Sequence, residues 1–233
     1  MEVAVLYSGG KDSTLAIEFC REKGWNIKYL LSVKPTRADC YLFHYATVEH
    51  TKELAEILGI KHILVSCSVA DPKKEAEIVK NVVEKNPVDA VVLGGVGLQI
   101  TQLRSIQEAL KPLKIEVFAS HAGQDSLELL KEMINKGYEI IITEIASDGL
   151  SKNYLGFRLD KGNLSQFVKL SEKYGFEILG EGGYYNSLVI DGPIFNKRLE
   201  ILETKRIMDD KYHGYLEVNK TRIANKVLAK NNL

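Results

Sequence analysis

The sequence predicts an α/β protein, with a parallel β-sheet covered by helices on both faces and a smaller C-terminal α+β domain. Two observations predict this fold class. Up to residue 145, short β-branched apolar runs alternate with helical periodicity, an alternation typical of parallel sheets. From residue 146 the chain becomes rich in Gly, Ser, Asn and Asp, as loops are. We therefore expect one domain over residues 1–145 and another over residues 146–233.

The expected elements follow one another regularly along the chain. Apolar runs predict strands at 3–7, 27–33, 62–66, 90–93, 116–118 and 139–142. Apolar residues with helical spacing predict helices at 14–23, 47–58, 72–85, 101–110 and 126–135. The second domain should add a helix at 164–174, a strand at 188–190, and a helix or strand pair in the tail. Ligands of parallel sheets bind beyond the C-terminal strand ends, so the loops after residues 7, 33, 66 and 93 should share one rim.

Composition narrows the classes of partner. The chain has 233 residues, 45% of them hydrophobic, which is ample for a core. Its 31 basic and 31 acidic side chains cancel, which disfavours a strong nucleic-acid binder. No apolar run reaches the ~20 residues that span a bilayer, and the early first strand leaves no room for a signal peptide.

The three cysteines are Cys20, Cys40 and Cys67, and none of them forms a C-x-x-C pair. This spacing indicates neither a zinc knuckle nor an iron–sulfur cluster. Widely spaced thiols favour a reducing compartment, so we expect a cytoplasmic protein.

The densest motif is Ser8-Gly9-Gly10-Lys11-Asp12-Ser13, between the first expected strand and the first helix. Free N–H groups and the positive end of the helix dipole make such a loop a phosphate cradle. The glycines let phosphate oxygens approach the backbone, the serines add hydroxyls, and Lys11 adds a charge. Asp12 either caps the helix or holds a magnesium ion bridged to the phosphates.

This motif matches the PP-loop S-G-G-x-D-S of the N-type ATP pyrophosphatases, and it differs from the Walker and G-x-G-x-x-G patterns. The resemblance implies a HUP-like fold of the adenine nucleotide alpha hydrolase type. It also implies binding of ATP and Mg²⁺, with cleavage of ATP into AMP and pyrophosphate.

A second motif is Glu181-Gly182-Gly183, followed by Leu188-Val189-Ile190-Asp191-Gly192-Pro193. Paired glycines after an acid indicate a sharp bend beside a ligand, and the alternative is an ordinary turn that opens a strand. Together with the PP-loop, this segment makes nearly the whole chain resemble the diphthine–ammonia ligase family. Further marks of the resemblance are Tyr41-Leu42-Phe43-His44, Gly94-Gly95, Gln102 and Tyr154-Leu155-Gly156. The chain departs from the family pattern at Tyr184 and Asn186, where acids are usual, and at Ser187, where threonine is usual.

The resemblance implies an AMP-forming ligase of diphthamide biosynthesis, in which a carboxylate of diphthine on translation elongation factor 2 is adenylated and then amidated by ammonia. Lys11, Asp12 and Glu181 would be catalytic, and Asp12 would hold the metal. ATP would contact Ser8, Gly9, Gly10, Lys11, Asp12, Ser13, His44, Gly94, Gly95 and Gln102. The acceptor would contact Tyr154, Gly182, Gly183, Tyr184, Asn186 and Ser187. No membrane and no nucleic acid would be involved, and a homodimer remains open.

Diphthine carries a quaternary ammonium group, and such cations suit aromatic cages. The rings that could form one are Tyr41, Phe43, Tyr45, Tyr154, Phe157, Tyr184 and Tyr185.

Two alternatives stay open at this point. The first is a PP-loop enzyme that modifies a tRNA base, although the chain lacks the paired cysteines usual in thiolation and is not basic. The second is an ATP- or AMP-binding sensor of the universal-stress type without turnover. Such domains carry a glycine-rich motif after the fourth strand, which Gly94-Gly95-Val96-Gly97 resembles only faintly.

Overall fold

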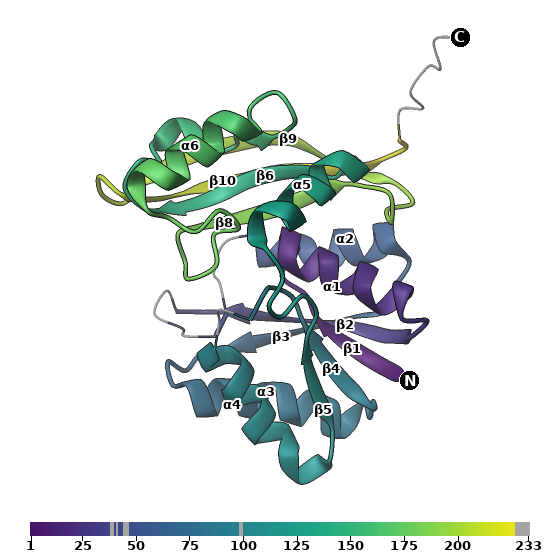
Figure 1. Cartoon of the computed structure of the whole chain (residues 1–233). Coiled ribbons are helices and arrows are strands. Elements are labelled where there is room, and N and C mark those ends of the chain that lie inside the picture. The colour runs from purple at the N-terminus through teal and green to yellow at the C-terminus, as the bar shows by residue number, and fades with distance from the viewer. Residues whose placement is uncertain (38–39, 41, 44–46, 98–99, 227–233) are drawn as a thin grey trace.

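A parallel sheet forms the N-terminal part of the protein (Figure 1). The structure is a computed structural model, and it describes residues 1–37, 40, 42–43, 47–97 and 100–226. The strands lie in the order β3-β2-β1-β4-β5, and all four pairings between neighbours are parallel. Their bounds are β1 (Glu2–Leu6), β2 (Asn26–Pro35), β3 (His62–Cys67), β4 (Ala90–Leu93) and β5 (Glu116–Ala119).

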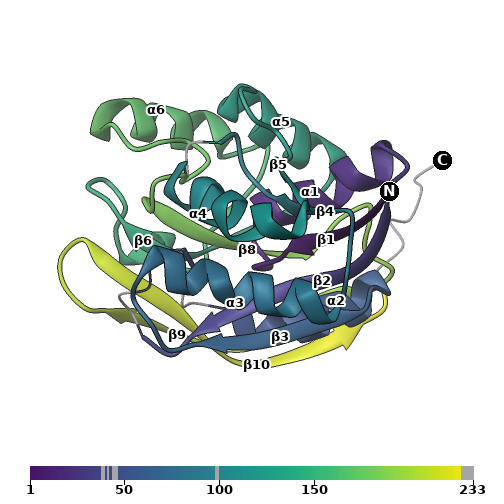
Figure 2. The same ribbon diagram turned by 90° about the horizontal axis from the view of Figure 1, so that it is seen from below.

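Helices cover both faces of this sheet, as the sequence predicts (Figure 2). On one face, α1 (Lys11–Glu22) and α2 (Thr51–Leu58) pack through Ile17 and Leu54. On the other face, α3 (Pro72–Lys85) and α4 (Ile100–Leu110) pack through Val79 and Ile106. The local sequence dictates where α3 begins, because Pro72 is its first residue and the Asp71 carboxylate accepts the Lys74 N–H at 2.9 Å.

A second, antiparallel sheet lies across the first, with α1 and α2 packed between the two sheets (Figure 1). Its order is β7-β6-β10-β9, and β8 also pairs with β6. Two helices accompany it. The bounds of these elements are α5 (Ser126–Lys136), β6 (Glu139–Ala146), β7 (Arg158–Leu159), α6 (Leu164–Tyr174), β8 (Tyr185–Asp191), β9 (Arg198–Met208) and β10 (His213–Ala224). Of the two structures expected for the tail, the strand pair is the one that forms.

Two expectations about single elements are wrong. The strand expected at 139–142 does not extend the parallel sheet: β6 is the centre of the second sheet and runs across the boundary expected at residues 145/146. A β-branched run specifies a buried strand, but not which sheet buries it. The first helix begins at Lys11 rather than near residue 14, because Gly9 turns the chain at φ +81° and Gly10 already occupies the N-cap position.

Candidate active site

The fold brings the ends of β1 and β4 together at the point where the strand order reverses. In such sheets, ligands bind in the crevice beyond the carboxyl ends of these strands. The PP-loop follows β1, and Gly94 follows β4. A methyl group at Gly94 would lie 2.3 Å from the backbone carbonyl of Asp12, so only glycine allows the two loops to approach this closely.

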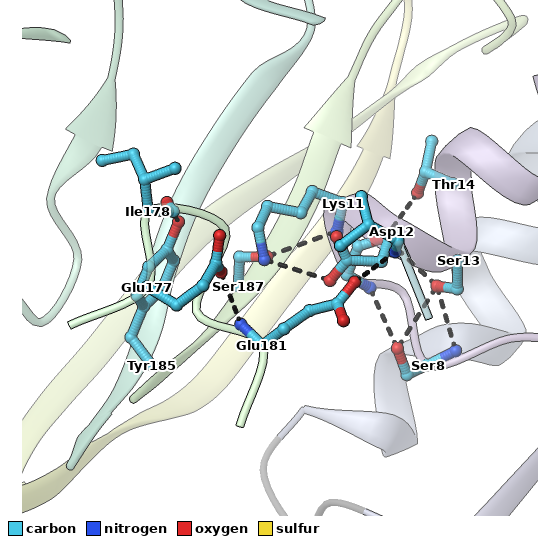
Figure 3. A network of polar contacts seen from close by, with 12 residues as sticks. Ser8, Lys11, Asp12, Ser13, Thr14, Glu177, Ile178, Glu181, Tyr185 and Ser187 are labelled. Carbon is cyan, nitrogen blue, oxygen red and sulfur yellow. Dashed lines mark hydrogen bonds and ion pairs between the residues drawn. The ribbon is translucent and has the colours of Figure 1, made fainter. Parts of the chain in front are cut away.

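Hydroxyl groups hold the PP-loop in shape (Figure 3). Ser13 Oγ accepts the Ser8 N–H at 3.2 Å and lies 3.2 Å from Ser8 Oγ. It also donates to the Gly10 carbonyl at 3.1 Å, which Thr14 Oγ1 reaches at 2.8 Å. The loop is therefore fixed before a phosphate arrives, which lowers the entropy lost on binding.

The second sheet completes the loop. The Val189 N–H of β8 donates to the Gly9 carbonyl at 2.9 Å, and the Lys11 N–H donates to Ser187 Oγ at 3.3 Å. A methyl group at Gly10 would lie 3.0 Å from the Ser187 carbonyl oxygen. Strand β8 of the antiparallel sheet thus packs against the backbone of the phosphate loop and is hydrogen-bonded to it.

Lys11 and Asp12 carry the charge of the site (Figure 3). Lys11 is only 2% exposed, and its Nζ lies 3.1 Å from Asp12 Oδ2 and 4.8 Å from the centre of the Tyr185 ring. Burial raises the pKa of Tyr185 well above its ordinary value, so the phenol stays neutral and donates to the Ile178 carbonyl at 2.7 Å. A buried ammonium between a carboxylate and a ring suits a phosphoryl oxygen.

Asp12 does not cap helix α1, because it lies inside the first turn and Gly10 is the N-cap. Its Oδ1 atom is buried and has no hydrogen-bond partner among the residues that the structure describes. A buried carboxylate oxygen in this state suits a cation, and carboxylates are preferred ligands of Mg²⁺. The side chain therefore fits the metal role better than the capping role.

One pocket brings together nine of the residues expected at the site: Ser8, Gly10, Lys11, Asp12, Ser13, Gly94, Gln102, Asn186 and Ser187. Gly9 lies in the same loop, with its carbonyl bound to β8. The apolar wall consists of residues in β2, at the end of β4 and in the segment after β2, among them Leu31, Val33, Leu93, Leu42 and Phe43. Of the four loops expected at one rim, those after residues 7, 33 and 93 contribute to this lining. Gln102 Nε2 bonds the Leu42 carbonyl and thereby joins α4 to this wall.

The other expected residues lie elsewhere. Glu181 is 3% exposed, accepts the Val96 N–H, and occupies the space where Gly95 lacks a side chain, so it supports the loop after β4.

The residues expected to contact the acceptor lie in several places. Gly182 and Gly183 form a turn, and Tyr184 packs against the core. Tyr154 packs against Phe157 in a tilted arrangement, with ring centres 5.2 Å apart, and does not line the pocket. His44, Tyr41 and Tyr45 lie outside the described residues. Two of the described rings that were proposed to form an aromatic cage line the pocket, namely Phe43 and Tyr185. The Lys11 ammonium lies over the Tyr185 ring.

A polar chain behind Asn186 was not predicted from the sequence. Asn186 Nδ2 donates to Glu144 Oε2 at 2.5 Å, and Glu144 Oε1 lies 3.0 Å from His213 Nε2. His213 Nδ1 lies 2.8 Å from Asp209 Oδ2. No sequence spacing joins these residues, because Glu144 and Asn186 meet only through the pairing of β6 with β8.

We expect His213 to make stability depend on pH. Partial burial alone would lower its pKa, but hydrogen bonds and charge from Glu144 and Asp209 raise the pKa above its ordinary value. A pKa raised on folding gives stability that is fully present below the unfolded pKa of about 6.5 and is lost as pH rises through the folded pKa. In His213→Gln, we expect the melting temperature to fall less over this pH range than in the parent protein.

His62→Gln is the matched control for this measurement. Burial lowers the pKa of His62, so its contribution has the opposite sign. Equal pH dependence of melting in His213→Gln and the parent protein would contradict the assignment.

A PP-loop at the switch point of this parallel sheet defines an adenine-nucleotide-binding protein of the α/β class. The chain matches the diphthamide synthase N-terminal domain over residues 1–111 and the diphthamide synthase C-terminal domain over residues 125–224. This chain belongs to the diphthamide synthase family.

Relatives from animals and fungi support the same assignment. A human protein named diphthine–ammonia ligase is 27% identical over 85% of this chain and 82% of its own length. The zebrafish protein of that name is 29% identical over 97% of this chain and 98% of its own. The fission yeast protein of that name is 26% identical over 90% of this chain but only 37% of its own. No helix among the described residues is long and apolar enough to cross a membrane.

Proposed function

We propose that this chain is a diphthine–ammonia ligase that adenylates the carboxylate of diphthine on translation elongation factor 2 and transfers free ammonia to it. The proposal rests on the PP-loop. Hydrogen bonds with β8 hold the backbone of this loop, and the side chain of its lysine, Lys11, is buried. The family and the named relatives confirm the expectation of an ATP-dependent ligase in diphthamide biosynthesis. A tRNA-modifying enzyme or a sensor without turnover is not favoured.

The residues divide between the two substrates. The PP-loop and Gly94 would hold ATP on the parallel sheet, while Asn186 and Ser187, which line the same pocket from the second sheet, would contact the acceptor. Asp12 would hold Mg²⁺, which would supply positive charge to neutralise the leaving pyrophosphate. Lys11 stabilises the same charge, and Ser8 and Ser13 orient the phosphates. Glu181 keeps the loop after β4 in position.

The chemistry requires activation of a carboxylate. A carboxylate is a poor electrophile because its negative charge is delocalised over the carboxyl group, and oxide or hydroxide is a poor leaving group. Transfer of AMP to the carboxylate removes that charge and supplies a good leaving group. The carboxylate oxygen bonds to the α-phosphorus while the bond from that phosphorus to the β-phosphate bridging oxygen breaks. Ammonia then attacks the acyl carbon, AMP leaves, and the amide loses a proton to solvent. The apolar wall of Leu31, Val33 and Leu93 keeps water from the mixed anhydride.

The proposal is tested with purified protein, MgATP, ammonium and elongation factor 2 that carries diphthine. We expect AMP and pyrophosphate in equal amounts, together with amidated elongation factor 2 detected by mass spectrometry. Formation of ADP and phosphate would overturn the adenylation chemistry. AMP formation that does not depend on the diphthine-bearing protein would overturn the acceptor.

A further inference from the structure

A cluster of two cysteines and a glutamate lies beside the nucleotide pocket and has no part in the chemistry above. Cys40 lies in the segment after β2, Cys67 is the last residue of β3, and Glu75 lies in the first turn of α3. One ligand atom from each of the three lies within 4.8 Å of the others. Cys67 and Glu75 are fully buried, and Cys40 is half-buried.

The distance between the sulfurs is compatible with a shared metal ion. The two Sγ atoms lie 3.8 Å apart. Two thiolates bound to one tetrahedral zinc ion at about 2.3 Å are separated by about 3.8 Å, whereas a disulfide needs about 2.05 Å. A metal would therefore fit between the sulfurs as they stand, whereas a covalent bond would require the two chain segments to move.

The donor set also points to a borderline-soft divalent ion. Two thiolates with one carboxylate suit Zn²⁺ and exclude Mg²⁺ and Ca²⁺, which take oxygen ligands. Without a metal, both thiols donate to the Val69 carbonyl, at 3.2 Å from Cys40 and 3.4 Å from Cys67. A metal must displace both thiol protons, so its apparent affinity rises with pH.

We propose that Cys40, Cys67 and Glu75 bind one Zn²⁺ ion, which fastens the segment after β2 to β3 and α3. With three protein ligands, a water molecule would take the fourth position of a tetrahedral ion. The ion would steady the pocket wall, because Leu42 and Phe43, the next described residues after Cys40, line the nucleotide pocket. The Leu42 N–H already donates to Glu75 Oε2 at 2.7 Å. A metal-bound Glu75 would therefore keep Leu42 in its place in the pocket wall.

Titration of the reduced, metal-free full chain with Co²⁺ tests the site without ATP, so the result is independent of the proposed ligase activity. We expect a thiolate-to-cobalt charge-transfer band that saturates at one ion per chain and disappears when Zn²⁺ is added. The band should be lost in Cys40→Ala and in Cys67→Ala. It should remain in Cys20→Ala, the matched control, because Cys20 is buried in α1 and lies outside the cluster.

Glu75→Gln separates the carboxylate from the thiols. We expect the charge-transfer band to remain but the Co²⁺ affinity to fall by more than about tenfold, the loss that even outer-shell partners of ligands produce. Unchanged affinity in this variant would overturn Glu75 as a ligand. Absence of the band in the parent protein would overturn the site whatever the variants do. A reduced chain that takes up no Co²⁺ but readily oxidises with loss of two thiols would identify the cysteines as a disulfide pair instead.

Discussion

Replacement of Lys11 by Met is expected to lower the rate of AMP and pyrophosphate formation by about 10²–10³-fold, the loss typical when one preorganised charge-stabilising donor is removed. Lys11 Nζ is held between Asp12 and the Tyr185 ring and is buried in the pocket, where charge interactions are strong. Methionine keeps the apolar stem of the side chain, so the fold should persist. Pyrophosphate release under saturating ATP measures the effect.

Lys34→Met is the control for this prediction. Lys34 lies near the end of β2, is 40% exposed in its side chain, and pairs with Glu49 at 3.6 Å, so its loss should change the rate little. A Lys11→Met protein that is folded and within a few-fold of the parent rate would contradict the role given to Lys11.

Gly94→Ala is expected to damage both stability and nucleotide binding. The added carbon would lie 2.3 Å from the Asp12 carbonyl carbon and oxygen and 2.6 Å from the Ser13 nitrogen. All three are backbone atoms that cannot rotate aside, so β4 and α1 must move apart. Overpacking of this kind lowers the free energy of unfolding by about 1–3 kcal/mol or more. Urea denaturation measures that loss, and calorimetry with ATP measures the accompanying loss of affinity.

Gly162→Ala provides the comparison for this effect. Among the described residues, its added carbon would meet Asp160 Oδ1, at 3.2 Å, in an exposed loop. That oxygen accepts the Gly162 and Asn163 N–H groups, but it is a side-chain atom at the surface and not backbone packed between two elements. If Gly94→Ala binds ATP as tightly as Gly162→Ala, the close approach of β4 to the PP-loop is not needed for the site.

The sequence predicted those parts of the protein that depend on local pattern. The helices at 72–85 and 164–174 lie at the expected residues, because a capping Asp–Pro pair and a terminal glycine are local signals. The PP-loop motif predicted that Ser8, Lys11 and Ser13 would lie together, because they are neighbours in the chain. The expectation for residues 139–142 was wrong because the sequence of a strand does not specify which sheet the strand joins.

Contacts between distant residues could not be predicted in this way. The pairing of Glu144 with Asn186 spans 42 positions and depends on the register of β6 with β8, which includes an irregularity between Ile142 and Glu144. Cys40 and Cys67 lack any metal-binding spacing and meet because β2 and β3 are neighbours in the sheet. Tyr185 was expected as one ring of a cage for the acceptor, but its face is taken by Lys11.

The hydrogen bond from the Val189 N–H to the Gly9 carbonyl limits which parts of this protein can be exchanged, by engineering or in evolution. The phosphate loop lies in the N-terminal half of the sequence, yet two of its backbone groups are hydrogen-bonded to a strand from the C-terminal half. The halves are therefore not interchangeable modules. A chimera that carries the first 111 residues on a different C-terminal domain would need an equivalent strand at the same place. Single substitutions that keep these two contacts of β8 are therefore expected to preserve the phosphate loop better than an exchange of the whole domain.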